Sequence, residues 1–111
     1  MKISGITPTG QHVLTGAFEQ CDTHGMPLWF LLAEAEKRHC VISLAHYFAS
    51  ALEHGWDDRK VFKHIKDALH GRGGDFERVK EQCVFLFLKQ AERMPGGTPR
   101  EIGKAMRKTL E

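Results

Sequence analysis

Six consecutive apolar residues, Cys83 to Leu88, dominate the hydrophobic pattern of the chain. The residues on either side are good helix formers without Gly or Pro, so the pattern predicts one helix over 75–94. Apolar residues occupy most of its circumference, and such a helix needs neighbours on several sides. We therefore expect 75–94 to be the central helix of a small helical domain. A buried strand is the alternative, but it lacks an evident partner strand.

Residues 27–54 read as two helices rather than one. Pro27 suits the first position of a helix. A single helix from there to His54 would be about 42 Å long, too long for a domain with a radius of gyration near 13 Å. The β-branched pair Val41-Ile42 offers a break, and Ser43 is a suitable N-cap for the second helix. The predicted helices are 27–39 and 43–54.

Two further helices follow from start and stop signals. Gly55 ends the helix before it, Trp56 is placed to pack back on that helix, and Asp57 or Asp58 caps the next one, 58–70. Thr98-Pro99-Arg100-Glu101 is a capping box with Pro in the first turn, which predicts a helix over 99–110.

The first 26 residues contain four Gly and one Pro among Ser and Thr. This composition predicts an irregular N-terminal arm over 1–26, with at most a short ordered piece at His12-Val13-Leu14 or Ala17-Phe18. Residues 27–111 then form a single helical domain. The expected fold class is all-α, a compact bundle of about five helices.

Composition places the chain among ordinary globular proteins. Its 111 residues are 41% hydrophobic and 27% charged, enough for one domain with its own core. Three cysteines cannot all pair within the chain, which favours a reduced environment. The start lacks the apolar run of a signal peptide, and no apolar run approaches the roughly 20 residues of a membrane-spanning helix. We expect a cytoplasmic protein with no membrane contact.

Positive charge is concentrated in the second half of the chain. Residues 1–55 contain three Lys/Arg and five Asp/Glu, whereas 56–111 contain thirteen and nine. At helical spacing these residues form two basic stripes, one on each of helices 58–70 and 99–110. If the stripes face the same way, they can neutralise several phosphates; a solvated surface is the simpler alternative. The stripes are Arg59, Lys63, Lys66 and His70, and Arg100, Lys104, Arg107 and Lys108.

A zinc site is the first chemical possibility to test, because the chain has seven histidines. Cys21-x-x-His24 and the pair His39-Cys40 provide four residues of the right type. The second pair is adjacent, however, so its side chains point apart, and structural zinc sites prefer spaced pairs. We expect no metal and no cofactor.

Catalytic motifs are equally incomplete. Ser43 and His46 share a helix face, but no third group or oxyanion site completes a nucleophile. Gly71-Arg72-Gly73-Gly74 precedes a helix, yet a phosphate loop follows a strand and ends in Lys-Ser/Thr. These absences predict a protein that is not an enzyme.

Large apolar side chains exceed what a core of this size needs, so we expect some of them to contact another protein or a second copy of the chain. The leading hypothesis is a small non-enzymatic protein–protein interaction protein that acts by steric blocking or bridging. Phage-encoded inhibitors of host machinery, such as anti-CRISPR proteins, are similar in size and style, by analogy only. A nucleic-acid-binding regulator that uses the basic stripes is the alternative. The candidate interface aromatics are Trp29, Phe30, Trp56 and Phe85.

Overall fold

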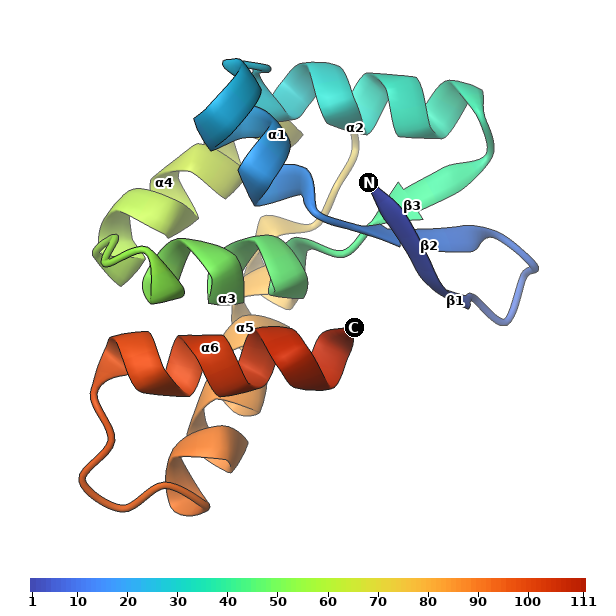
Figure 1. Cartoon of the computed structure of the whole chain (residues 1–111). Coiled ribbons are helices and arrows are strands. Elements are labelled where there is room, and N and C mark those ends of the chain that lie inside the picture. The colour runs from blue at the N-terminus through green and yellow to red at the C-terminus, as the bar shows by residue number, and fades with distance from the viewer.

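The computed structural model describes residues 1–111 as six helices and one small sheet (Figure 1). The mainly helical fold is as predicted, whereas the sheet and the first helix are not. The strands are β1 (Lys2–Ile6), β2 (His12–Thr15) and β3 (Cys40–Ile42). The helices are α1 (Ala17–His24), α2 (Leu28–Lys37), α3 (Leu44–Glu53), α4 (Asp58–Leu69), α5 (Phe76–Glu92) and α6 (Pro99–Leu110).

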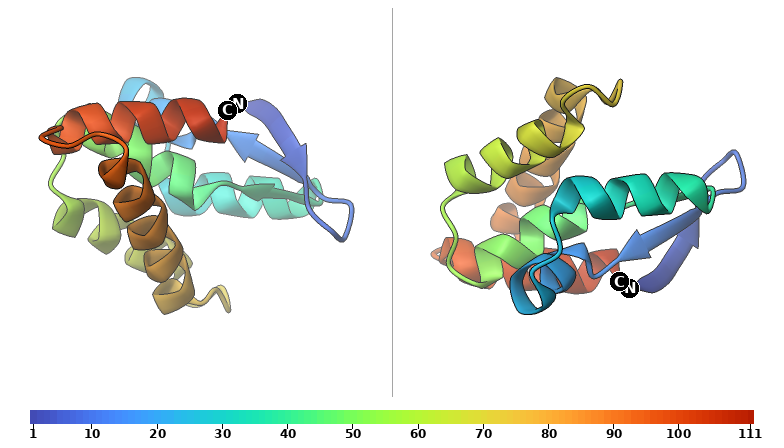
Figure 2. Two further views of the ribbon diagram at one scale, coloured as in Figure 1. Left: turned by 90° about the horizontal axis from the view of Figure 1, so that it is seen from below. Right: turned by 90° about the horizontal axis from the view of Figure 1, so that it is seen from above.

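The N-terminal segment is ordered, so the prediction of an irregular arm over 1–26 is wrong. β1 and β2 form an antiparallel hairpin, and β2 pairs in parallel with β3. The Thr7 carbonyl accepts the Gly10 N–H at 2.9 Å, and Gly10 has a φ of 86°, which glycine adopts readily. The sheet projects from one end of the helical body (Figures 1 and 2).

Helix α1 joins the N-terminal segment to the core. Gly16, with a φ of 100°, turns the chain from β2 into α1. Phe18 is only 1% exposed, and its ring contacts those of Tyr47 and Trp56 edge-on. Residues 1–26 therefore contribute to the same core as the later helices.

The predicted break between helices 27–39 and 43–54 is confirmed, and the residues at the break form a strand. Val41 and Ile42 lie in β3, where they pair with Val13 and Leu14 of β2. Ser43 then caps α3 by accepting the His46 N–H at 3.1 Å. The apolar pair is used as a strand because β2 supplies a partner from residues far away in the sequence.

Helix α3, and not α5, is the buried centre of the fold, which corrects the central helix expected over 75–94. Every residue of α3 from Ala45 to Leu52 is buried, whereas Cys83 is the only buried residue of α5. Figure 1 shows α3 between α1 and α2 on one side and α6 on the other. The run of six apolar residues favoured α5, but α3 is the more hydrophobic helix over its whole length and also has small side chains.

Small residues allow α3 and α6 to pack closely. Ala49 and Ala51 are fully buried on α3, and Gly103 on α6 faces the α3 backbone. A Cβ at Gly103 would lie 2.8 Å from the Ala49 carbonyl oxygen. The two helices therefore meet at a distance that only glycine permits.

The predicted helix boundaries agree with the structure to within two residues. The capping box of α6 is complete: the Thr98 side chain accepts the Glu101 N–H, and the Glu101 carboxylate accepts the Thr98 N–H. Asp57 caps α4 by accepting the Arg59 N–H. No helix combines the length and the apolar character needed to cross a membrane.

Candidate binding groove

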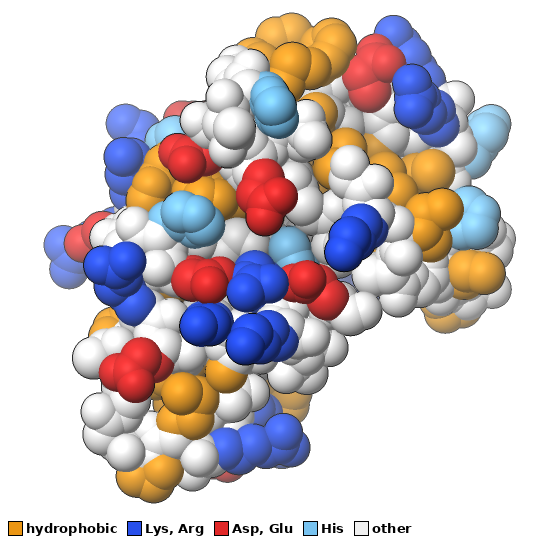
Figure 3. All heavy atoms as spheres, in the orientation of Figure 1, with side chains coloured by type: hydrophobic (Ala, Val, Ile, Leu, Met, Phe, Trp, Pro, Cys, Tyr) orange, Lys and Arg blue, Asp and Glu red, His pale blue; other side chains and the backbone are white.

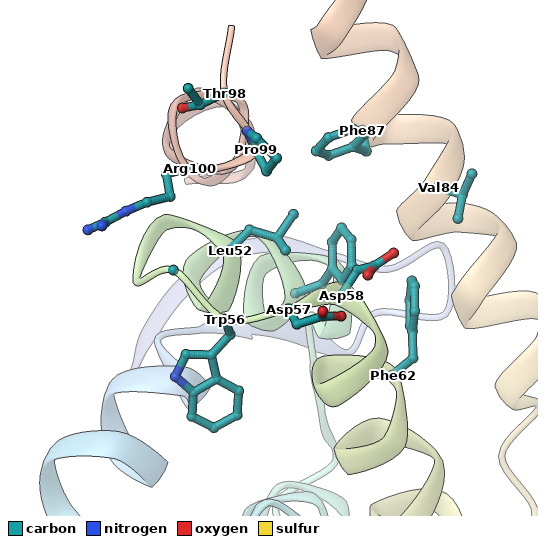
Figure 4. A pocket seen from close by; sticks show the side chains of 12 residues that line it. Leu52, Trp56, Asp57, Asp58, Phe62, Val84, Phe87, Thr98, Pro99 and Arg100 are labelled. Carbon is teal, nitrogen blue, oxygen red and sulfur yellow. The ribbon is translucent and has the colours of Figure 1, made fainter.

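A groove of about 760 Å³ opens where four helices meet (Figure 4). It is bounded by the end of α3, the start of α4, the middle of α5 and the start of α6. The residues lining it combine an apolar floor with a polar rim. The floor consists of Phe48, Leu52, Phe62, Val84 and Phe87. The rim includes Asp57, Asp58, Thr98 and Arg100.

The turn between α3 and α4 brings one wall of the groove into place. Gly55 has a φ of 87°, and the Trp56 N–H donates to the Ala51 carbonyl at 3.0 Å, so the chain folds back on α3 as predicted. The half-buried Trp56 ring packs edge-on against Phe18, and the Lys60 ammonium lies 4.0 Å from its centroid. Figure 4 shows the Trp56 ring pointing away from the groove.

Aromatic packing fixes the floor. The Phe48 ring of α3 stacks on the Phe62 ring of α4 with centroids 4.9 Å apart. Val84 and Phe87 of α5 form the opposite side. Because the floor comes from three helices that pack on one another, its shape is set by the core and does not depend on a loop.

Two carboxylates point into the groove from the start of α4. Asp57 and Asp58 both accept the Arg59 N–H, at 2.8 and 2.9 Å. This hydrogen bond lowers the pKa of Asp57 below its ordinary value of 3.8, so the carboxylate is ionised at neutral pH. Figure 4 shows both carboxylates directed toward the space between α4 and α5, whereas Arg100 points away. The groove therefore has two carboxylates above an apolar floor, and the Lys80 ammonium lies 5.7 Å from the centroid of the Phe62 ring in that floor.

The first basic stripe lies on α4. All four of its side chains are exposed, and none forms an ion pair within 4.0 Å. The Lys66 ammonium lies 5.8 Å from the centroid of the Phe76 ring. The stripe consists of Arg59, Lys63, Lys66 and His70, as predicted from their spacing.

The second basic stripe is partly used within the molecule. Arg107 pairs with Glu53 of α3 and with Glu111, and its hydrogen bond lowers the pKa of Glu53 below 4.5. Arg100 donates to the Glu53 carbonyl at 3.2 Å. Figure 3 shows Lys and Arg side chains over α3 and α6 interleaved with Asp and Glu. The members of this stripe without an ion pair are Arg100, Lys104 and Lys108.

The four candidate interface aromatics lie on three different elements. Trp29 is 55% exposed on α2, with Phe30 edge-on beside it at a centroid distance of 6.0 Å. Phe85 is exposed on α5, where it lines a second, smaller groove against α6. Trp56, in the turn between α3 and α4, is the only one of the four that borders the main groove, and its ring points away from the groove.

Buried Ser50 and His46 form, with the exposed Glu111, a chain of polar groups that the sequence did not indicate. The His46 Nδ1 lies 3.4 Å from the Ser50 hydroxyl and accepts the Gly16 N–H, and its Nε2 lies 3.4 Å from the Glu111 carboxylate. The order of these residues, Ser, His and Glu, resembles that of a hydrolase triad. Ser50 is only 3% exposed, however, so a substrate cannot reach its oxygen. These polar contacts instead connect α3 to the C-terminal residue and to the start of α1.

The two residue pairs considered for zinc lie on separate elements. Cys21 and His24 belong to α1, whereas His39 and Cys40 lie at the start of β3. No three His, Cys, Asp or Glu side chains in the structure are grouped to hold a metal ion. Burial, together with the nearby Asp22 carboxylate, raises the pKa of the Cys21 thiol to about 11, so the free thiol is protonated at neutral pH.

No family model, curated protein or solved structure matches this chain. The groove is therefore the feature of the molecule that bears most directly on function. The sequence indicated Asp57 and Asp58 only as helix caps, and Phe48, Phe62 and Phe87 belong to three separate predicted helices, 43–54, 58–70 and 75–94. No local signal shows that these segments meet, because their meeting depends on how α3 packs against α4, α5 and α6.

Proposed function

We propose that the protein is a non-enzymatic interaction protein that binds a segment of a partner protein in the groove between α3, α4, α5 and α6. The observation that supports the proposal is the pair of carboxylates, Asp57 and Asp58, directed over an apolar floor. Such a protein catalyses no reaction; it acts by blocking the bound segment or by bridging it to another molecule.

The chemistry of the groove defines the partner segment. Lys and Arg carry a cationic head on an apolar stem, and this shape suits carboxylates placed above Phe62 and Phe87. The groove is larger than one side chain, so a neighbouring Leu, Phe or Met of the same segment would occupy the rest of the floor. The partner segment is therefore basic and apolar.

Selection of random displayed peptides on the purified protein tests this proposal. We expect enrichment of peptides that place Lys or Arg beside Leu, Phe or Met. The double variant Asp57→Asn/Asp58→Asn removes both charges while Asn preserves the helix cap. The enriched peptides should bind this variant about tenfold or more weakly, as measured by fluorescence anisotropy.

Asp67→Asn is the matched control, because Asp67 is exposed on the same helix but does not line the groove. Its peptide affinity should equal that of the wild type. Two outcomes contradict the proposal: no enrichment of basic and apolar peptides, or equal peptide affinity in the double variant and the wild type.

Nucleic-acid binding is a second candidate, supported by the exposed and unpaired basic stripe of α4. The second stripe supports it less, because Arg107 is engaged by Glu53 and Glu111. Lys63→Glu should abolish retention of DNA or RNA at low salt, and wild-type retention should weaken steeply as salt rises. Lys2→Glu on β1 is the matched charge reversal, because Lys2 is exposed and lies outside both stripes. Filter binding of the wild type that shows no retention at low salt would dismiss this candidate.

A further inference from the structure

The outer face of α5 exposes three neighbouring apolar side chains. Phe85 is 59% exposed, Leu88 is 56% exposed and Val84 is 39% exposed. Leu88 lies three residues after Phe85 and four residues after Val84, so the three side chains share one side of the helix. Figure 2 shows that much of α5 lies at the edge of the molecule. An apolar surface of this kind on a charged helix is typical of a contact site.

The charges of α5 are arranged symmetrically, with opposite sign, about Phe85. At four, seven and eight residues on either side of Phe85, an acidic residue on one side corresponds to a basic residue on the other. All of these charged side chains are exposed. Outward from Phe85, the pairs are Glu81 and Lys89, Arg78 and Glu92, and Glu77 and Arg93.

The inner two pairs lie on the same face as Phe85. An α-helix turns by about 100° per residue, so positions four and seven residues away lie within about 40° of Phe85 around the axis. These charges would therefore face whatever covers Phe85. A covering helix that runs in the opposite direction needs the same series of charges with the signs exchanged, and a second copy of α5 has that series.

We propose that the protein forms a twofold symmetric dimer in which α5 packs antiparallel against α5 of a second copy, with Phe85 on the axis. At each end of the helix pair, the twofold axis places Glu81 and Arg78 of one copy against Lys89 and Glu92 of the other. Each group of four is neutral, and at each distance from the axis an acidic residue of one copy is matched by a basic residue of the other, which favours this register.

The apolar side chains also satisfy this symmetry. Val84 and Leu88 lie on the same side of Phe85 around the helix, and a twofold axis perpendicular to the helices keeps them on the same side in both copies. The six side chains of the two copies then form one apolar cluster. A dimer has two main grooves, one in each copy, so it could bridge two partner segments. Val84 is shared by the groove and this surface, whereas Asp57 and Asp58 lie outside the surface, so dimer formation does not depend on the two carboxylates of the proposed peptide site.

Charge reversal tests the pairing by sedimentation over a range of protein concentrations. The wild type should associate reversibly to a dimer. Lys89→Glu places two glutamates against each other at both ends, so its dissociation constant should rise about tenfold or more, and Glu81→Lys should act alike. Mixing the two single variants should restore association as a heterodimer. One chain then carries a lysine at both of these positions and the other a glutamate at both, so opposite charges meet at each end.

Three controls separate pairing from other effects. Lys104→Glu changes the same charge on α6 and should leave the dimer intact, as should Asp57→Asn/Asp58→Asn. Thermal melting of each variant at low concentration shows whether the monomer remains folded. A wild type that stays monomeric up to millimolar concentration would overturn the proposal. So would single reversals that associate as the wild type does, or a mixture that fails to form heterodimers.

Discussion

Phe18→Ala should lower the free energy of unfolding by about 3–5 kcal/mol, the range expected when a buried Phe side chain is removed from a core. Phe18 is 1% exposed, and its ring centroid lies 5.6 Å from that of Tyr47, 4.8 Å from His54 and 5.2 Å from Trp56. These contacts join α1 to α3 and to the turn that follows it. Urea denaturation followed by circular dichroism measures the change.

Phe85→Ala is the matched control, because it makes the same substitution at a ring that is 59% exposed. Measured at a concentration where the protein is monomeric, it should cost less than about 1 kcal/mol, as surface changes usually do. If Phe18→Ala costs no more than Phe85→Ala, α1 does not contribute to the core as the structure shows.

Local signals in the sequence predicted α2 to α6 well. Pro27, Ser43 and the capping box at Thr98 act within a few residues of where they stand, so their effects can be recognised without a fold. The strands depend on distant partners instead. β2 pairs with β3, whose residues lie 28 positions later in the register His12 to Cys40, and no local pattern in the Gly- and Thr-rich start announces that pairing.

The central helix was assigned wrongly because one consecutive apolar run was taken as the measure of burial, although α3 is more hydrophobic than α5 over its whole length. The apolar run of α5 contains Phe85 and Leu88, which are exposed, whereas Ala45 and Ala49 of α3 are buried. Small side chains are suited to the centre when neighbouring backbones approach closely, and that approach is a property of the packed helices. The groove was missed for the same reason, since its floor exists only after α3, α4 and α5 have packed.

Gly103→Ala should destabilise the protein by about 1–3 kcal/mol, the usual cost of overpacking a core. In an unconstrained helix, the same change would stabilise by up to about 1 kcal/mol. At Gly103, the added Cβ would lie 2.8 Å from the Ala49 carbonyl oxygen and 2.8 Å from the Leu52 Cβ. Neither atom can rotate out of the way, so α6 would have to move away from α3.

Gly5→Ala gives the comparison, because no atom lies within 4 Å of the Cβ it would add. Thermal melting of both variants beside the wild type measures the difference, with Gly5→Ala expected to melt close to the wild type. The sign of the Gly103→Ala effect is decisive. A rise in melting temperature would mean that helix propensity prevails and that α3 and α6 are farther apart than the structure places them. A lower melting temperature would show that the close packing of α3 and α6 depends on the absence of a side chain at Gly103. The same packing positions one wall of the groove.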